Sequence, residues 1–273
     1  MSCSYFRGMV QGELKEASEL RTNGHITLPV NGESRAFLIL MLAVHGRTRT
    51  VPRKISFAIL SHLSIMVDYY RCHEGLELFS DLWMQHLKGT FDITHRSQWM
   101  NWLLISWVFN QEDIFSEITA FIPLISTDTI DSGEWPIPKE IIDAMNKGQY
   151  KYIEKALDIL QGFYQGLIDG KVKCLQVGNE GWEYCAMCCY NTPGALITHM
   201  KQMGLFSPRP QRPYPGIRPD YLRFDCFKEM ESNLKLTDEL HYHCDLARRV
   251  GAILNKTPYP PNLEFADIAL PRP

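Results

Sequence analysis

One long helical pattern constrains the fold of this chain more than any other feature. Between Pro138 and Gly170, apolar residues recur at intervals of three or four and form one stripe: Ile153, Leu157, Leu160, Tyr164 and Leu167. Proline suits the first turn of a helix, and glycine suits the position after its last residue. Gly148 lies within the early part of the pattern, where glycine costs about 1 kcal/mol relative to alanine. The pattern predicts a long helix with one buried side.

Shorter helical patterns fill most of the chain before it. The run from Arg35 to Val44 is apolar on almost every side and leads to Gly46, which suits the end of a helix. Two further stripes, joined by the short polar stretch "DYYRCHE", predict a helical hairpin. The stripe residues are Ile55, Ile59, Leu63 and Met66 in the first helix and Leu76, Phe79, Trp83 and Leu87 in the second.

The next block, "SQWMNWLLISWVFNQEDIFSEITAFIPL", contains two more helical patterns and the tryptophans Trp99, Trp102 and Trp107. Each tryptophan carries a large apolar surface, and in folded proteins most of that surface is buried. We therefore predict that these rings pack in a hydrophobic core rather than around a cofactor.

Strand signals are few. The best is "HITLPV", in which Ile26, Leu28 and Val30 alternate with other residues. A cysteine- and glycine-rich stretch after Lys171 is compatible with a short hairpin or a knuckle, and a helix follows it. The prolines of "SPRPQRPYPGIRP" predict an extended segment. The sequence as a whole predicts a mainly α protein.

Composition limits the classes of partner and compartment. The chain has 273 residues, with 28 basic and 31 acidic side chains and a formal net charge of −3, so direct nucleic-acid binding is not expected. The longest apolar run, Ala36 to Val44, is shorter than the roughly 18 residues that span a membrane. Eight cysteines without a secretory signal favour a reducing compartment. We expect a cytoplasmic or nuclear protein that does not enter a membrane.

The first part of the chain resembles the second half of a BTB/POZ domain, in particular in BTB-domain-containing proteins of filamentous fungi. The likeness is carried by "SYFRGM" and "ELKEASEL", by "ITLPVNGESRAFLILMLAVHGRTRTVPRKI" and by "IMVDYYRCHEGLELFSDLWMQHL", and more weakly by "WLLISWVF". Three regions are predicted: a partial BTB/POZ-like α/β core at residues 1–88, a helical extension at 89–170, and a cysteine-bearing, proline-linked helical region at 171–273.

The resemblance also implies a function. BTB/POZ domains are non-catalytic protein-interaction modules that recruit substrates to cullin ubiquitin ligases or assemble transcriptional regulators. Such a domain begins with strands and helices that precede the Tyr-Phe step, here Tyr5-Phe6, and these supply much of its homodimer interface. We expect either that this chain has lost that N-terminal part or that its start site is placed too late, which leaves a homodimer in doubt. Protein partners are expected in either case.

No catalytic signature stands out, and an enzyme is not expected. The sequence has no G-x-S-x-G elbow, no phosphate-binding loop and no dinucleotide fingerprint. His73 and Glu74 begin like the H-E-x-x-H zinc motif, but the second histidine is absent. A helix start explains both residues better than a catalytic role.

The cysteines leave one alternative open. Cys185 and Cys188 form a C-x-x-C pair that can direct two thiolates at one zinc ion, and His241 and Cys244 share a face if their segment is helical. Together the four residues would hold a structural zinc, or a catalytic one if a coordination position stays open. Otherwise they are buried free thiols, and no cofactor is expected.

Two exposed-looking stretches are candidates for partner contact. One is a basic loop in "HGRTRTVPRK", and the other is the surface of the predicted hairpin. A short basic loop is often only a solvated connection. In the proline segment, Pro210-x-x-Pro213 next to Arg212 suits an SH3-type groove or a stiff linker. The candidate partner-binding residues are Arg47, Arg49, Arg53, Lys54, Tyr69, Tyr70, His73 and Glu77.

Overall fold

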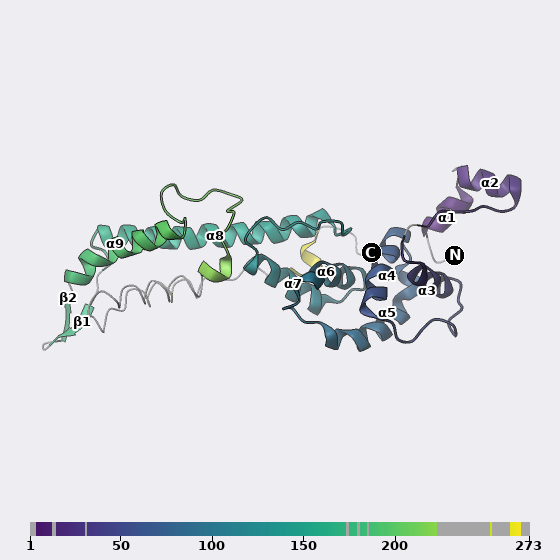
Figure 1. Ribbon diagram of the computed structural model, residues 1–273, viewed down its shortest axis with the longest axis horizontal. Coiled ribbons are helices and arrows are strands. Elements are labelled where there is room, and N and C mark those ends of the chain that lie inside the picture. The colour runs from purple at the N-terminus through teal and green to yellow at the C-terminus, as the bar shows by residue number, and fades with distance from the viewer. Residues whose placement is uncertain are drawn as a thin grey trace. The chain divides into compact units, whose positions relative to one another are not determined.

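The computed structural model describes residues 4–12, 15–30, 32–172, 175–178, 181–184, 186–222, 252 and 263–268. Most of the described residues are helical (Figure 1), which confirms the mainly α prediction. The chain divides into two compact units. Unit 1 comprises residues 1–119, 132–141 and 263–273, and unit 2 comprises residues 120–131 and 142–262. The three predicted regions stay a prediction.

The helices follow one another closely. In chain order they are α1 (Ser4–Gln11), α2 (Lys15–Asn23), α3 (Ser34–Val44), α4 (Phe57–Tyr70), α5 (His73–Leu87), α6 (Trp99–Val108), α7 (Glu112–Ile125), α8 (Lys139–Ile168) and α9 (Ala186–Gln202). Short 3₁₀ turns occupy Lys88–Thr90, Arg96–Gln98 and Phe265–Asp267. No helix in the described part of the chain is long and apolar enough to cross a membrane.

Neighbouring residues determine where α3 begins and ends. The Glu33 carboxylate accepts a hydrogen bond from the Ala36 N–H (2.5 Å) and caps the start of α3. At the other end Gly46 has φ +69°, and the Arg47 N–H donates to the Leu42 carbonyl (2.8 Å). A glycine just after a helix predicts this left-handed residue and the hydrogen bond that follows it.

The core of unit 1 forms where α3, α4, α5 and α6 pack together. All three predicted tryptophans are buried, with Trp99, Trp102 and Trp107 only 7%, 1% and 4% exposed. The Trp102 ring lies against Phe57 and Phe91, at 5.0 and 5.4 Å between ring centroids. The prediction that these rings form core is confirmed.

The predicted helical hairpin is present as α4 and α5, which are joined by Arg71 and Cys72. Arg71 takes the left-handed conformation (φ +53°) that ends α4. Most of the predicted stripe residues are buried, including Leu63 and Met66 of α4. Ile55 and Ile59 are only half-buried, because the inward side of α4 runs through Leu60, Leu63, Val67 and Tyr70 instead.

The predicted strand at residues 25–30 is wrong, because these residues have no regular secondary structure. A strand is stable only when a neighbour satisfies its N–H and C=O groups, and no described residue of 1–88 is in a strand. The α/β part of the predicted core therefore has no support in the described residues. The described strands lie instead in the cysteine-rich stretch, where β1 (Leu175–Gly178) and β2 (Gly181–Tyr184) form an antiparallel hairpin.

Unit 2 contains most of the predicted long helix. Helix α8 begins directly after Pro138 and ends before Gly170, which has φ +68°. The predicted stripe faces a core shared with α9 and the segment after it, and Tyr164 alone of the five is half-buried. The buried members of this core are Ile153, Ala156, Leu157, Leu160, Phe163, Leu167, Leu196, Met200, Leu205, Tyr214, Ile217 and Leu222.

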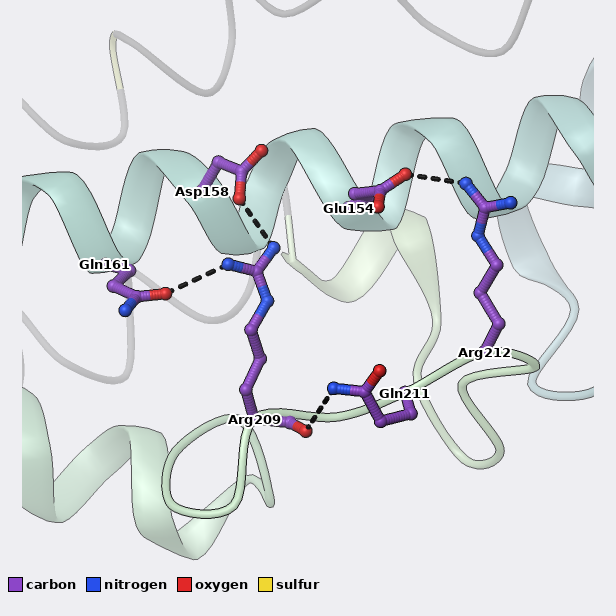
Figure 2. Close-up of polar contacts among 6 residues, drawn as sticks. All are labelled: Glu154, Asp158, Gln161, Arg209, Gln211 and Arg212. Atoms are coloured by element: carbon purple, nitrogen blue, oxygen red, sulfur yellow. Dashed lines mark hydrogen bonds and ion pairs between the residues drawn. The ribbon is translucent and has the colours of Figure 1, made fainter.

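The proline segment is not the extended linker that its composition predicts. Figure 2 shows that it lies along α8, where Arg209 donates to Asp158 (2.5 Å) and Gln161 (2.9 Å), and Arg212 donates to Glu154 (2.6 Å). Tyr214 is buried at 4% exposure in a left-handed conformation (φ +58°). Because its arginines and its tyrosine are already bound within unit 2, the segment does not present a free proline-rich ligand in this conformation.

Candidate functional site

The basic loop between α3 and α4 is exposed at its charges and anchored at its middle. Val51 is 2% exposed, and the Pro52 carbonyl accepts a hydrogen bond from the Trp83 Nε1–H of α5 (2.9 Å). The Arg53 guanidinium lies 5.8 Å from the centre of the Phe79 ring, also on α5. These contacts hold the backbone of the loop against α5 while its cationic groups face solvent.

The four cations of the loop have no acidic partner among the residues that the structure describes. Arg47, Arg49, Arg53 and Lys54 are all exposed, and none forms an ion pair with a described residue. The arginines of the proline segment, in contrast, each bind a carboxylate. Because the backbone of this loop is already anchored, less backbone entropy is lost when an anion binds its cations than in a loose loop.

A first prediction follows from the anchor. Replacing Trp83 with phenylalanine keeps most of the buried ring but removes the hydrogen bond to Pro52, so we expect a loss of stability of about 1 kcal/mol. Amide hydrogen exchange in residues 47–56 should become faster, while exchange in α6 should not change. A Trp83→Phe variant with unchanged exchange in the loop would contradict the anchoring role.

The predicted hairpin surface contains a buried side chain as well as an exposed one. Tyr69 is 61% exposed, but Tyr70 is only 7% exposed, because its ring stacks on Phe6 of α1 at 5.0 Å between centroids. The Tyr5 and Tyr69 hydroxyl groups are 3.5 Å apart, and this hydrogen bond, together with burial, raises the pKa of Tyr5 to about 12. Of the two predicted tyrosines, Tyr69 is exposed to solvent and Tyr70 packs between α1 and α4.

His73 is the first residue of α5 and lies half-buried at the end of the hairpin connection. Its Nε2 atom is buried without a hydrogen-bond partner among the described residues. Burial lowers the pKa of His73 and the nearby Arg71 lowers it further, against an opposing effect of Asp68. His73 is therefore neutral at pH 7 and contributes packing rather than charge.

The lowered pKa of His73 predicts a pH-dependent stability. The unfolded chain binds a proton near pH 6.5, before the folded chain does, so stability falls as the pH drops below 6.5 towards the folded pKa. Between pH 7.5 and 5.5 we therefore expect this group to lower the free energy of unfolding. Urea unfolding of the wild type and of His73→Gln at both pH values checks this, since the variant should lose that increment. An equal loss in both proteins would show that other groups cause it.

A stripe of acidic residues on α5 was missed by the sequence analysis, apart from Glu77. Glu74, Glu77 and Asp81 are exposed and form no ion pair with described residues. Leu78 lies among them and is 79% exposed, more than any other large hydrophobic side chain in the described part of the chain. Leu78 lies outside the Leu76–Phe79–Trp83 stripe, and this position in the sequence indicates that its side chain faces solvent.

The proposed metal ligands are not tested by the structure. Cys185, His241 and Cys244 lie outside the described residues, and only the helical backbone of Cys188 is described. Among the residues that are described, no group of three or more histidine, cysteine, aspartate or glutamate side chains is placed to hold a metal ion. Zinc binding stays a prediction.

Comparison with known proteins gives no relative for this chain: no family model matches it, and neither a curated protein nor a solved structure is similar to it.

Proposed function

We propose that this chain is a non-catalytic protein-interaction protein whose main contact surface is the basic loop together with the outward side of α5. The observation that carries the proposal is a set of four exposed cations that form no ion pair with any described residue, on a loop that Val51 and the Pro52–Trp83 hydrogen bond hold in place. Preorganised surface charges of this kind steer association and give specificity more than affinity. The partner segment at the loop is acidic.

The surroundings of the loop favour a protein over a nucleic acid. Arg53 lies against Phe79 of α5, and the same helix exposes Glu74, Glu77 and Asp81. A phosphate backbone would be attracted by the loop and repelled by these carboxylates, and the net charge of −3 adds no attraction. Carboxylates around the exposed Leu78 match the polar rim and apolar centre of protein–protein interfaces.

The resemblance to BTB/POZ domains adds a role to this proposal. It implies an adaptor or regulatory scaffold that works in ubiquitin-ligase recruitment or transcriptional regulation, in the cytoplasm or the nucleus. The order of short helices from α3 to α6 agrees with a helical interaction module. The missing strands in the described part of residues 1–88 set it apart from a complete BTB/POZ core.

A pull-down with paired variants tests the proposal. Three proteins are immobilised: the wild-type chain, an Arg47→Ala/Arg49→Ala/Arg53→Ala/Lys54→Ala variant and a control that replaces four lysines of α8. The proteins that each retains are compared by quantitative mass spectrometry with and without nuclease treatment. The control lysines are exposed and form no ion pair in the described residues: Lys139, Lys147, Lys151 and Lys155.

We expect the loop variant to lose a discrete set of proteins that the wild type and the α8 control both retain. The lost proteins should then bind the purified wild-type chain directly, with an affinity that falls as salt rises. Identical sets from the wild type and the loop variant would contradict the proposal. Retention that disappears with nuclease would assign the loop to nucleic acid instead.

A further inference from the structure

We propose that α6 and α7 form a recognition surface for a short peptide, and that residues 263–268 of this chain occupy the surface in cis. The surface differs from the basic loop, so the inference does not rest on the proposed function. The segment, here called the docking turn, reads Leu-Glu-Phe-Ala-Asp-Ile. Residues 142–262 belong to unit 2, whereas the docking turn belongs to unit 1. Contacts between residues far apart in the sequence therefore hold it there.

The docking turn buries its apolar side chains and exposes the residues between them. Leu263, Phe265 and Ile268 are 7%, 4% and 5% exposed, and the three residues between them are all exposed. The buried residues are the anchors of the turn. Short peptides that dock on helical proteins bind through apolar anchors spaced in this way.

The central anchor meets an aromatic surface of α6 and α7. The centroid of the Phe265 ring lies 5.6 Å from that of Trp107 in α6 and 4.7 Å from that of Phe115 in α7. One turn after Phe115, the Thr119 hydroxyl oxygen accepts a hydrogen bond from the Leu263 N–H (3.3 Å). A few polar contacts at the edge of an aromatic surface are typical of sites that hold a bound ligand.

Hydrogen bonds within the docking turn define its shape. The Glu264 N–H donates to the Asp267 carboxylate (2.9 Å), and the Asp267 N–H donates to the Glu264 side chain, which completes a capping box. The Ile268 N–H also donates to the Phe265 carbonyl (3.3 Å). Because these bonds join neighbouring residues, a separate peptide of the same sequence can form the same turn. A peptide with such a local preference loses less entropy when it docks.

Binding of a separate peptide to the whole chain tests the inference. The probe is a fluorescently labelled peptide of residues 261–270, and its anisotropy is measured with the wild-type chain and with Phe265→Ala/Ile268→Ala. The variant keeps the surface but removes two anchors of its own turn, so we expect it to bind the peptide with a Kd below about 0.1 mM. The wild type should bind at least about ten-fold more weakly, because its own turn competes at a high effective concentration.

Two altered peptides show whether the anchors carry the binding. A peptide with Phe265→Ala should bind the variant at least about ten-fold more weakly, whereas Ala266→Ser, at an exposed position, should bind as well as the unaltered peptide. Equal binding of the three peptides would overturn the inference. So would equal binding to the wild type and the variant, or no binding to a variant whose circular dichroism matches that of the wild type.

Hydrogen exchange of the wild-type chain tests the inference without a substitution, and it decides the question if the double variant does not fold. A docked segment opens locally, whereas part of a cooperative core exchanges only when the whole unit unfolds. We expect the amides of residues 267 and 268 to exchange at least about ten-fold faster than the slowest amides of α6. Equal free energies of opening in the docking turn and in α6 would overturn the inference.

Discussion

Replacing Trp102 with alanine should destabilise unit 1 by about 3–5 kcal/mol, the range for a large aromatic side chain deleted from a core. Trp102 is 1% exposed, and its ring contacts Phe57 of α4 and Phe91. The substitution leaves a cavity between α6 and α4, which pack on each other. Small domains have a total stability of roughly 5–15 kcal/mol, so the variant should lose helical circular dichroism signal at a clearly lower temperature than the wild type.

The matched variant is Trp102→Phe. The Trp102 Nε1–H is buried without an acceptor among the described residues, so phenylalanine keeps much of the ring packing and also removes an unsatisfied donor. We expect a cost of about 1 kcal/mol in urea unfolding followed by circular dichroism. If both substitutions cost the same, or if alanine costs less than about 1 kcal/mol, the ring is not the centre of the core.

The second large effect is expected in unit 2, at Asn146. Its side chain accepts from the Ile130 N–H (2.8 Å) and donates to the Ile130 carbonyl (2.9 Å), and both residues are buried. Alanine leaves the two peptide groups of Ile130 unpaired, and each buried unsatisfied group costs about 1–3 kcal/mol. We expect Asn146→Ala to lower the free energy of unfolding by about 2–4 kcal/mol.

Two comparisons show whether this cost comes from the pair of hydrogen bonds. Asn146→Asp keeps the acceptor for the Ile130 N–H but turns the donor to the Ile130 carbonyl into a second acceptor, so it should also destabilise strongly. Thr129→Ala removes only an exposed hydrogen bond between the hydroxyl groups of Thr129 and Tyr150 (2.9 Å) and should cost less than about 0.5 kcal/mol. A cost at Asn146 no larger than that at Thr129 would show that water replaces the lost bonds.

Helical elements were predictable because their signals are local. The stripe along α8, Pro138 before it and Gly170 after it lie within one segment and agree with one another, and the structure follows them. The same holds for Gly46 after α3 and for the burial of the three tryptophans. Each of these predictions needed only the period of the apolar residues and the chemistry of helix ends.

The failures come from contacts between distant residues. Alternation at Ile26, Leu28 and Val30 reads as a strand, but a strand forms only with a neighbour, which local sequence does not show. Proline content correctly excluded a helix between Pro208 and Pro215, yet it gave no sign that Arg209 and Arg212 bind carboxylates on α8.

The candidate surface could be predicted only in part, because it also depends on contacts between distant residues. The cluster of cations in the basic loop is visible in the sequence, but the Pro52–Trp83 hydrogen bond that anchors it joins residues 31 positions apart. The exposure of Leu78 and the burial of Tyr70 depend on which side of each helix faces the core. Phe265, likewise, packs on Phe115 at 4.7 Å between ring centroids, a contact that no local pattern indicates.

Hydrogen exchange with and without an acidic peptide tests most directly the claim that the basic loop is the contact surface. Amide exchange of the whole chain is measured alone and with an excess of a glutamate-rich peptide, for the wild type and for Arg47→Ala/Arg49→Ala/Arg53→Ala/Lys54→Ala. We predict that residues 46–56 gain protection from the peptide in the wild type and not in the variant. Protection that is the same in both proteins, or that increases only in other segments, would contradict the account.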